Sequence, residues 1–133
     1  MSRRTLQPSE MLPGAAAAMG QVVCSKGTHV HISGQTAVDK TGAVVGDDLA
    51  SQIDTTLENV RIALAEVGAT PSNLVRFTTY IVDYQPDQIA AYMTAMHSFF
   101  DPENLPACAL IGVSALAQPE LLVEIEATAV IDE

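Results

Sequence analysis

The chain has 133 residues, a length typical of one domain, and 16 acidic residues against 6 basic ones give it a formal charge of −10. The basic residues are scattered and form no stripe, which disfavours nucleic acids and anionic membranes as partners because both bind clustered positive charge. No apolar run reaches the roughly 20 residues of a transmembrane helix, and the opening MSRRTLQPSEMLPG lacks the apolar core of a signal peptide. We therefore expect a cytoplasmic protein.

The first third of the chain predicts an arm, two short strands and a hairpin. Prolines, a glycine and an alanine run indicate a loosely ordered N-terminal arm at 1–17, so the folded domain is expected at 18–133. Extended runs at 21–26 and 28–33 are separated by a Lys-Gly turn. The segment TAVDKTGAVVG favours a small hairpin whose turn, residues 39–42, ends in a glycine suited to a positive φ.

The clearest helix is predicted at 48–67. Its large aliphatic residues recur every three or four positions, which places them on one helical face. An aspartate at its start and Gly68 after its end are suitable caps. The run LVRFTTYIV at 74–82 is rich in β-branched and aromatic residues and predicts a strand. The remaining predicted elements are a second helix from about Pro86 and strands at about 107–114 and 121–131.

These elements follow the order β-β-(hairpin)-α-β-α-β-β, which predicts an α+β domain of two layers, with two helices packed on a mixed sheet. The last strand, LLVEIEATAV, shows the alternation that such a sheet requires, because successive side chains point to opposite faces. Val123 and Ile125 share one face, whereas Glu124, Glu126 and Thr128 share the other. The helices can cover only one face. By itself, the second face is the water-exposed side of an ordinary strand.

Other residues that could carry chemistry are few. The sequence lacks a P-loop, a dinucleotide-binding loop, a nucleophile elbow and a zinc-binding helix motif. THVHIS puts His29 and His31 on one strand face without a third ligand at a local spacing, so no metal site is predicted. Cys24 and Cys108 lack CxxC spacing and are expected to be free thiols. Because no cation neighbours Cys108 in the sequence, a small buried thiol is favoured over a reactive one.

Five segments together resemble the RidA family, also called the YjgF family. They are ISGQTAVDKTGAVVG, QIDTTLENVRIALAEVGA, NLVRFTTYIVD, FFDPENLPA and LLVEIEATAV, and in this order they cover roughly residues 18–131. The resemblance implies a chorismate-mutase-like fold and a homotrimer with clefts between neighbouring subunits. It also implies hydrolysis of reactive small-molecule enamines and imines to a keto acid and ammonia, without a cofactor. A trimer would account for a charged fraction of only 17%, below the roughly 25% of an average soluble protein.

The resemblance implies site residues as well. The first glutamate of EIE corresponds to Glu124, the position that holds and activates water in the family. The motif SGQ corresponds to Ser33 and Gly34 at the wall of the cleft. On this interpretation Glu124 is the acid and base of the reaction, and Glu126 is its neighbour on the same strand face.

Two positions depart from the family pattern. Deaminating members carry an arginine two residues after the proline of a PAR motif, where it binds the substrate carboxylate; here PAC places Cys108 at that position, followed by Ala109. Met19 stands close to the position of a family tyrosine. We expect these three residues to line the substrate cleft.

The departures leave several functions open. The first is an enamine or imine hydrolase of altered specificity, and the alternative is a non-catalytic trimer that binds a metabolite or a partner protein in the same cleft. An RNA-cleaving role fits poorly with a charge of −10. Thiol chemistry at Cys108 lacks a neighbouring base to activate the sulfur.

Overall fold

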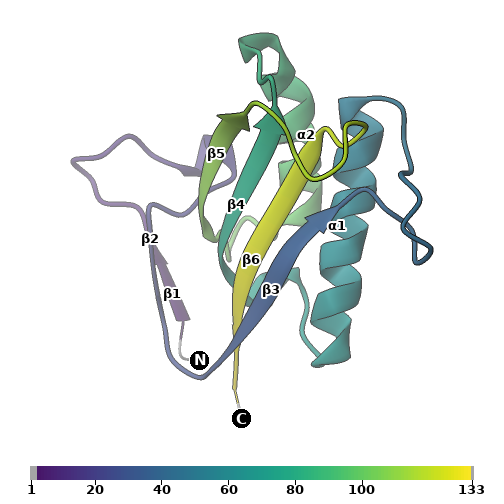
Figure 1. Ribbon diagram of the computed structural model, residues 1–133. Helices are drawn as coiled ribbons and strands as arrows, with labels where there is room; N and C mark the ends of the chain where they lie inside the picture. The colour runs from purple at the N-terminus through teal and green to yellow at the C-terminus, as the bar shows by residue number, and fades with distance from the viewer. Residues whose placement is uncertain (1–2, 133) are drawn as a thin grey trace.

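The computed structural model describes residues 3–132 and contains one large and one small sheet (Figure 1). Its elements in chain order are β1 (Arg3–Leu6), the short 3₁₀ helix η1 (Ala15–Ala17), β2 (Val22–Ser25), β3 (Thr28–Thr36), α1 (Leu49–Glu66), η2 (Pro71–Asn73), β4 (Leu74–Val82), η3 (Pro86–Gln88), α2 (Ile89–Phe99), β5 (Ala107–Val113) and β6 (Val123–Ile131). Two helices against a mixed sheet confirm the predicted two-layer α+β class.

The large sheet has four strands in the order β3-β6-β4-β5. β6 is antiparallel to both of its neighbours, β3 and β4, whereas β5 runs parallel to β4. Both helices lie behind the sheet in Figure 1, and α1 packs against β3, β6 and α2. The front face of the sheet, which we call the open face, is thus covered by neither described helix. Within residues 3–132, no helix is long and apolar enough to cross a membrane.

The helix α1 forms where its periodicity predicted. Asp48 caps the start, since its side chain accepts a hydrogen bond of 2.8 Å from the Ser51 N–H. The aliphatic side chains in the middle of the stripe are buried against the sheet: Ile53, Leu57, Val60 and Leu64. Val67, expected on the same stripe, follows the last helical residue and is 42% exposed. The next residue, Gly68, has a φ of +72°, which a glycine adopts without strain.

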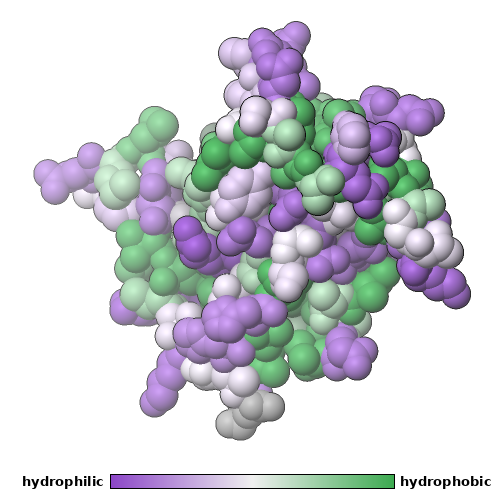
Figure 2. Space-filling model, viewed as in Figure 1, coloured by the Kyte–Doolittle hydropathy of each residue, from purple (hydrophilic) through white to green (hydrophobic). Residues whose placement is uncertain are grey.

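The strand β6 shows the predicted alternation. Val123, Ile125 and Ala127 are buried on the helix side of the sheet, where they join the main hydrophobic core. Glu124 and Glu126 project from the open face, half-buried and exposed respectively. Figure 2 views the molecule from the same side as Figure 1, and polar residues occupy the middle of the face that it shows.

Two N-terminal predictions differ from the structure. The segment 1–17, expected to be loosely ordered, contains β1, which pairs antiparallel with β2. The Arg3 guanidinium also donates hydrogen bonds to the backbone carbonyls of Ser72 and Asn104, so distant segments anchor this strand. The predicted hairpin is reduced to a single bridge between Val38 and Val44, because the loop between them folds around the side chain of Asp39. The boundary between residues 17 and 18 stays a prediction.

Candidate active site

The open face carries three rows of side chains that cross the strands. Residues that face each other in neighbouring strands project on the same side of a sheet. The rows, read from β3 or β6 toward β5, are Thr36, Glu124, Tyr80 and Ile111; then Glu126, Thr78 and Ala109; then His31, Thr128, Arg76 and Ala107. The two carboxylates are therefore set among hydroxyl groups, one histidine and one arginine.

Glu124 lies directly over the backbone of Gly34. A Cβ atom at position 34 would stand 2.1 Å from Glu124 Oε2 and 2.8 Å from its Cδ, so only glycine leaves room for this carboxylate. Gly34 belongs to the irregular part of β3, where the pairing with β6 shifts register between Ile32 and Gln35. The bulge and the missing side chain together seat the Glu124 carboxylate against β3.

Glu126 is oriented from the neighbouring strand. The Tyr80 hydroxyl donates a hydrogen bond of 2.9 Å to Glu126 Oε2. This bond is the main cause that raises the pKa of Tyr80, followed by desolvation and by the charges of Glu126 and Glu124. Tyr80 is consequently a hydrogen-bond donor at neutral pH. Because Tyr80 itself faces Glu124 across the sheet, it stands between the two carboxylates.

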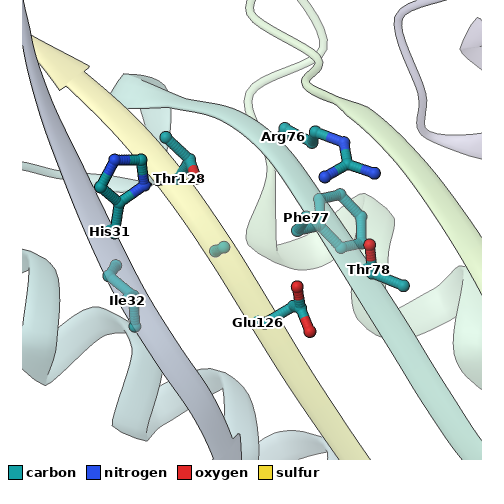
Figure 3. Close-up of a pocket in the computed structure, with 8 residues that line it drawn as sticks. His31, Ile32, Arg76, Phe77, Thr78, Glu126 and Thr128 are labelled. Carbon is teal, nitrogen blue, oxygen red and sulfur yellow. Dashed lines mark hydrogen bonds between the residues drawn. The ribbon is translucent and has the colours of Figure 1, made fainter.

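A pocket of about 130 Å³ opens beside Glu126 (Figure 3). Its polar wall is made by side chains of three neighbouring strands: His31 of β3, Arg76 and Thr78 of β4, and Glu126 and Thr128 of β6. The ring nitrogen Nδ1 of His31 lies 3.3 Å from the Thr128 hydroxyl oxygen. Arg76 makes no ion pair or hydrogen bond with another residue of the described part. The pocket therefore offers one positive and one negative group to a small ligand.

The structure brings together some of the residues predicted from the sequence. Glu124 and Gly34 are in contact, and Ser33, next to Gly34, is exposed. Ala109 lies on the open face, opposite Thr78 in the row of Glu126. These four positions share one side of the sheet or its bulge.

Cys108 and Met19 lie away from the open face. Cys108 faces the buried Phe77 and packs against the core on the helix side, opposite to Glu124. Burial raises the pKa of its thiol to about 11. Met19 follows η1, outside the large sheet, and its carbonyl accepts a hydrogen bond of 2.9 Å from the Gln7 side chain. Neither residue therefore belongs to the rows of the open face that hold the two carboxylates.

Three residues of the open face were missed by the sequence analysis. Arg76, Thr78 and Tyr80 alternate along β4 with the buried Phe77, Thr79 and Ile81. The same alternation is readable in LVRFTTYIV, so the face was predictable. The sequence could not predict that these residues lie close to the carboxylates, because this closeness depends on β4 lying next to β6. In residues 3–132, no three histidine, cysteine or acidic side chains gather into a group that could hold a metal ion.

Comparisons with known proteins show which family the chain is similar to. A family model described as Endoribonuclease L-PSP matches residues 10–131. The 2-iminobutanoate/2-iminopropanoate deaminase of Salmonella typhimurium is 34% identical over 121 residues, which cover 87% of this chain and 91% of that protein. A RutC family protein of Pyrococcus abyssi is 32% identical over 104 residues, 77% of this chain and 79% of that protein.

One solved structure is similar over almost the whole length. The protein YyfB of the Rid family, from Yersinia pestis, has a TM-score of 0.94 at 39% identity, covering 98% of this chain and 100% of that chain. The similarity therefore includes the open face as well as the helices.

Proposed function

Because the chain belongs to the Rid family, we propose that it is a deaminase that hydrolyses a reactive small-molecule enamine or imine and releases ammonia. The family and the chorismate-mutase-like fold predicted from the sequence are confirmed by the same comparisons. The named activity of the Salmonella relative supports the reaction class. The observation that carries the proposal is the Glu124 carboxylate, held against Gly34 on a sheet face that no described helix covers.

In the proposed reaction, Glu124 activates the attacking water. The water oxygen forms a bond to the imine carbon while Glu124 takes one proton from the water and passes it to the imine nitrogen, which gives a tetrahedral amino alcohol and leaves Glu124 ionised again. The C–N bond then breaks as the hydroxyl proton passes to the nitrogen through Glu124, leaving a carbonyl compound and ammonia. An enamine first becomes the imine by gaining a proton on carbon and losing one from nitrogen. Imines hydrolyse readily, so positioning of substrate and water supplies much of the rate.

The proposal includes assembly into a homotrimer, with the site in a cleft between subunits, and a location in the cytoplasm. An uncovered face of a four-stranded sheet supports assembly, since it exposes apolar side chains such as Ile111, which is 43% exposed. The low content of charged residues, 17%, points the same way. Ser33 and Ala109 would line the cleft together with Glu124. Cys108 and Met19 can contribute only where a neighbouring subunit meets their segments.

A trapping assay tests the deaminase function. Amino-acid oxidase generates imines from neutral and acidic amino acids, and semicarbazide traps whatever imine survives. A deaminase lowers the yield of semicarbazone, and Glu124→Gln, which keeps the shape of the side chain but cannot accept the proton, removes this effect. Equal yields with and without the wild-type protein, for every imine, would contradict the proposal.

A second candidate is a non-catalytic trimer that binds a small metabolite or a partner protein in the same cleft. The observation in its favour is Cys108, which lies on the helix side of the sheet at the position where deaminating relatives carry an arginine. A ligand that raises the melting temperature without being turned over would favour this function. RNA cleavage is not proposed, because the chain has a charge of −10 and its basic residues form no stripe.

A further inference from the structure

The two carboxylates of the open face are held in different ways. The Glu124 carboxylate lies over the backbone of Gly34 in β3, and it makes no hydrogen bond with another residue between 3 and 132. The Glu126 carboxylate is turned toward β4 instead (Figure 3), where its Oε2 accepts a hydrogen bond of 2.9 Å from the Tyr80 hydroxyl. Two acidic side chains that leave β6 on the same face are thus turned toward opposite neighbouring strands.

Exposure to water does not explain why Glu124 rather than Glu126 would act as the base. Glu124 is half-buried, whereas Glu126 is exposed. By access to water alone, Glu126 would be the carboxylate that accepts a proton. A general base must also lie within hydrogen-bond reach of the water that it activates. The orientation of each carboxylate therefore decides between them, and the Tyr80 hydroxyl fixes the orientation of Glu126.

Tyr80 is well placed for this task. It lies directly opposite Glu124 in the pairing of β4 with β6, and Glu126 is its diagonal neighbour, two residues further along β6. Diagonal neighbours are about 7–8 Å apart, a distance that an aromatic side chain can span. A hydroxyl that donates to an ionised carboxylate makes roughly twice as strong a hydrogen bond as two neutral groups do. This bond is the main cause that raises the pKa of Tyr80, so the hydroxyl keeps its proton at neutral pH.

We propose that Tyr80 is a positioning residue: by holding Glu126 on the β4 side, it leaves Glu124 as the one of the two carboxylates that is free to activate water. This inference rests on the proposed deaminase function and gives the two glutamates different roles in it. Glu124 takes and returns the proton, whereas Glu126 accepts the Tyr80 hydroxyl and takes no part in proton transfer. The second glutamate consequently does not replace the first when Glu124 is substituted.

Releasing Glu126 in a protein that lacks the Glu124 carboxylate tests the assignment. Glu124→Gln removes the base, and adding Tyr80→Phe removes the hydroxyl but keeps the ring. Residues two apart on a strand are separated by about 7 Å, so a released Glu126 can reach the water at Glu124 directly or through one further water. We expect imine loss with Glu124→Gln/Tyr80→Phe to be about tenfold or more faster than with Glu124→Gln, which is part of the contribution of a well-placed base. Damage to the fold cannot produce such a gain.

Two further variants show whether the gain comes from Glu126. Adding Glu126→Gln to the double variant should return the rate to that of Glu124→Gln alone. Glu124→Gln/Tyr84→Phe is the matched control, because the Tyr84 hydroxyl makes no hydrogen bond within the described part of the chain, and it should show no gain. Equal rates with Glu124→Gln and Glu124→Gln/Tyr80→Phe would overturn the role of Tyr80. A gain that survives Glu126→Gln would overturn it as well.

Titration of the tyrosine hydroxyls tests the bond between Tyr80 and Glu126 without any imine. The charged groups that act on Tyr80 are Glu126, Glu124 and Arg76. Because the bond to Glu126 is the largest cause of the raised pKa, Glu126→Gln should lower the pKa of Tyr80 toward the roughly 10 of a free tyrosine. The tyrosinate absorbance that is missing in Tyr80→Phe reports on this group. Glu66→Gln, on the exposed side of α1, is the control and should leave the pKa unchanged.

The titration separates this inference from the deaminase function. An unchanged pKa of Tyr80 in Glu126→Gln would overturn the positioning role, whether or not the protein turns over imines. A lowered pKa in a protein whose wild type turns over no imine would refute the deaminase function, and the role of Tyr80 in that reaction would fall with it. Unchanged mass and melting temperature establish that each variant is folded and assembled.

Discussion

Gly34 and Glu124, ninety positions apart in the sequence, are in direct contact: a Cβ on Gly34 would lie 2.1 Å from a Glu124 carboxylate oxygen. The three nearest atoms to that Cβ all belong to the Glu124 side chain, at 2.1, 2.8 and 3.1 Å, and none belongs to the backbone. A side chain at position 34 therefore displaces the carboxylate without breaking the sheet.

Gly34→Ala should lower deaminase activity while leaving the fold intact. The Glu124 side chain can swing away over the open face, so the melting temperature should change little and kcat should fall. A double-mutant cycle with Glu124→Asp, which keeps a carboxylate on a shorter side chain, measures the effect: in that background, adding Gly34→Ala should cost less activity than it does in wild type, because both changes act through one carboxylate. A further loss in the double variant, as large as in the single one, would show that Gly34 acts independently of Glu124.

The buried thiol of Cys108 should make the free energy of unfolding depend on pH in the alkaline range. Burial raises the pKa of this thiol to about 11, above the roughly 8.5 of an unfolded cysteine. The folded state therefore holds the proton more tightly, and the stabilisation is complete below about pH 8.5 and is lost as the pH rises through about 11. In Cys108→Ala, the free energy of unfolding should fall less steeply with pH across this window than in wild type.

Thiol labelling provides the second readout for this prediction. At neutral pH, iodoacetamide should modify the exposed Cys24 and leave Cys108 intact until the protein unfolds. Cys24→Ala is the control for the pH profile, and it should keep the wild-type slope. Identical slopes in wild type and Cys108→Ala, together with rapid labelling of Cys108 in the folded protein, would contradict the buried placement of this thiol.

Replacing the buried Gln52 should lower the stability of the protein. Gln52 is 1% exposed, and its side chain binds the carbonyls of Gly46 and Glu120 and the N–H of Leu122. Gln52→Leu keeps the helix but leaves these backbone groups without partners, so the free energy of unfolding should fall by about 1–3 kcal/mol or more. Urea denaturation measures this, with Thr55→Val as control, since the Thr55 side chain bonds only within α1. Equal stability of both variants would refute the prediction.

The elements with strong local patterns could be predicted from the sequence. The strand β4 was expected at 74–82 and is found at Leu74–Val82, because nearly every residue in it favours a strand. The α1 helix follows from its repeat and its aspartate cap. The alternation in β6 predicted that Glu124 and Glu126 share one face. Each of these signals is local and needs no knowledge of neighbouring strands.

The remaining features depend on contacts between distant segments. β1 has four residues and is held by its pairing with β2 and by the Arg3 guanidinium, so no local pattern indicates it. The face of the sheet from which the Cys108 side chain projects depends on the register of β5, because a shift of one residue would move this side chain to the opposite face. The pocket near Arg76 requires β4 to lie beside β6. In the sequence, Arg76 is only one of six scattered basic residues.

The measurement that tests the central claim most directly is the rate of imine loss as a function of protein concentration, for wild type and Glu124→Gln in parallel. Glu66→Gln, a change of the same chemistry on the exposed helix side, is the control. We predict that the rate rises in proportion to the concentration of wild type or of Glu66→Gln. With Glu124→Gln, the rate should stay at the uncatalysed value at every protein concentration. A rate that rises equally with all three proteins, or with none of them, would contradict the assignment of Glu124 as the residue that activates water.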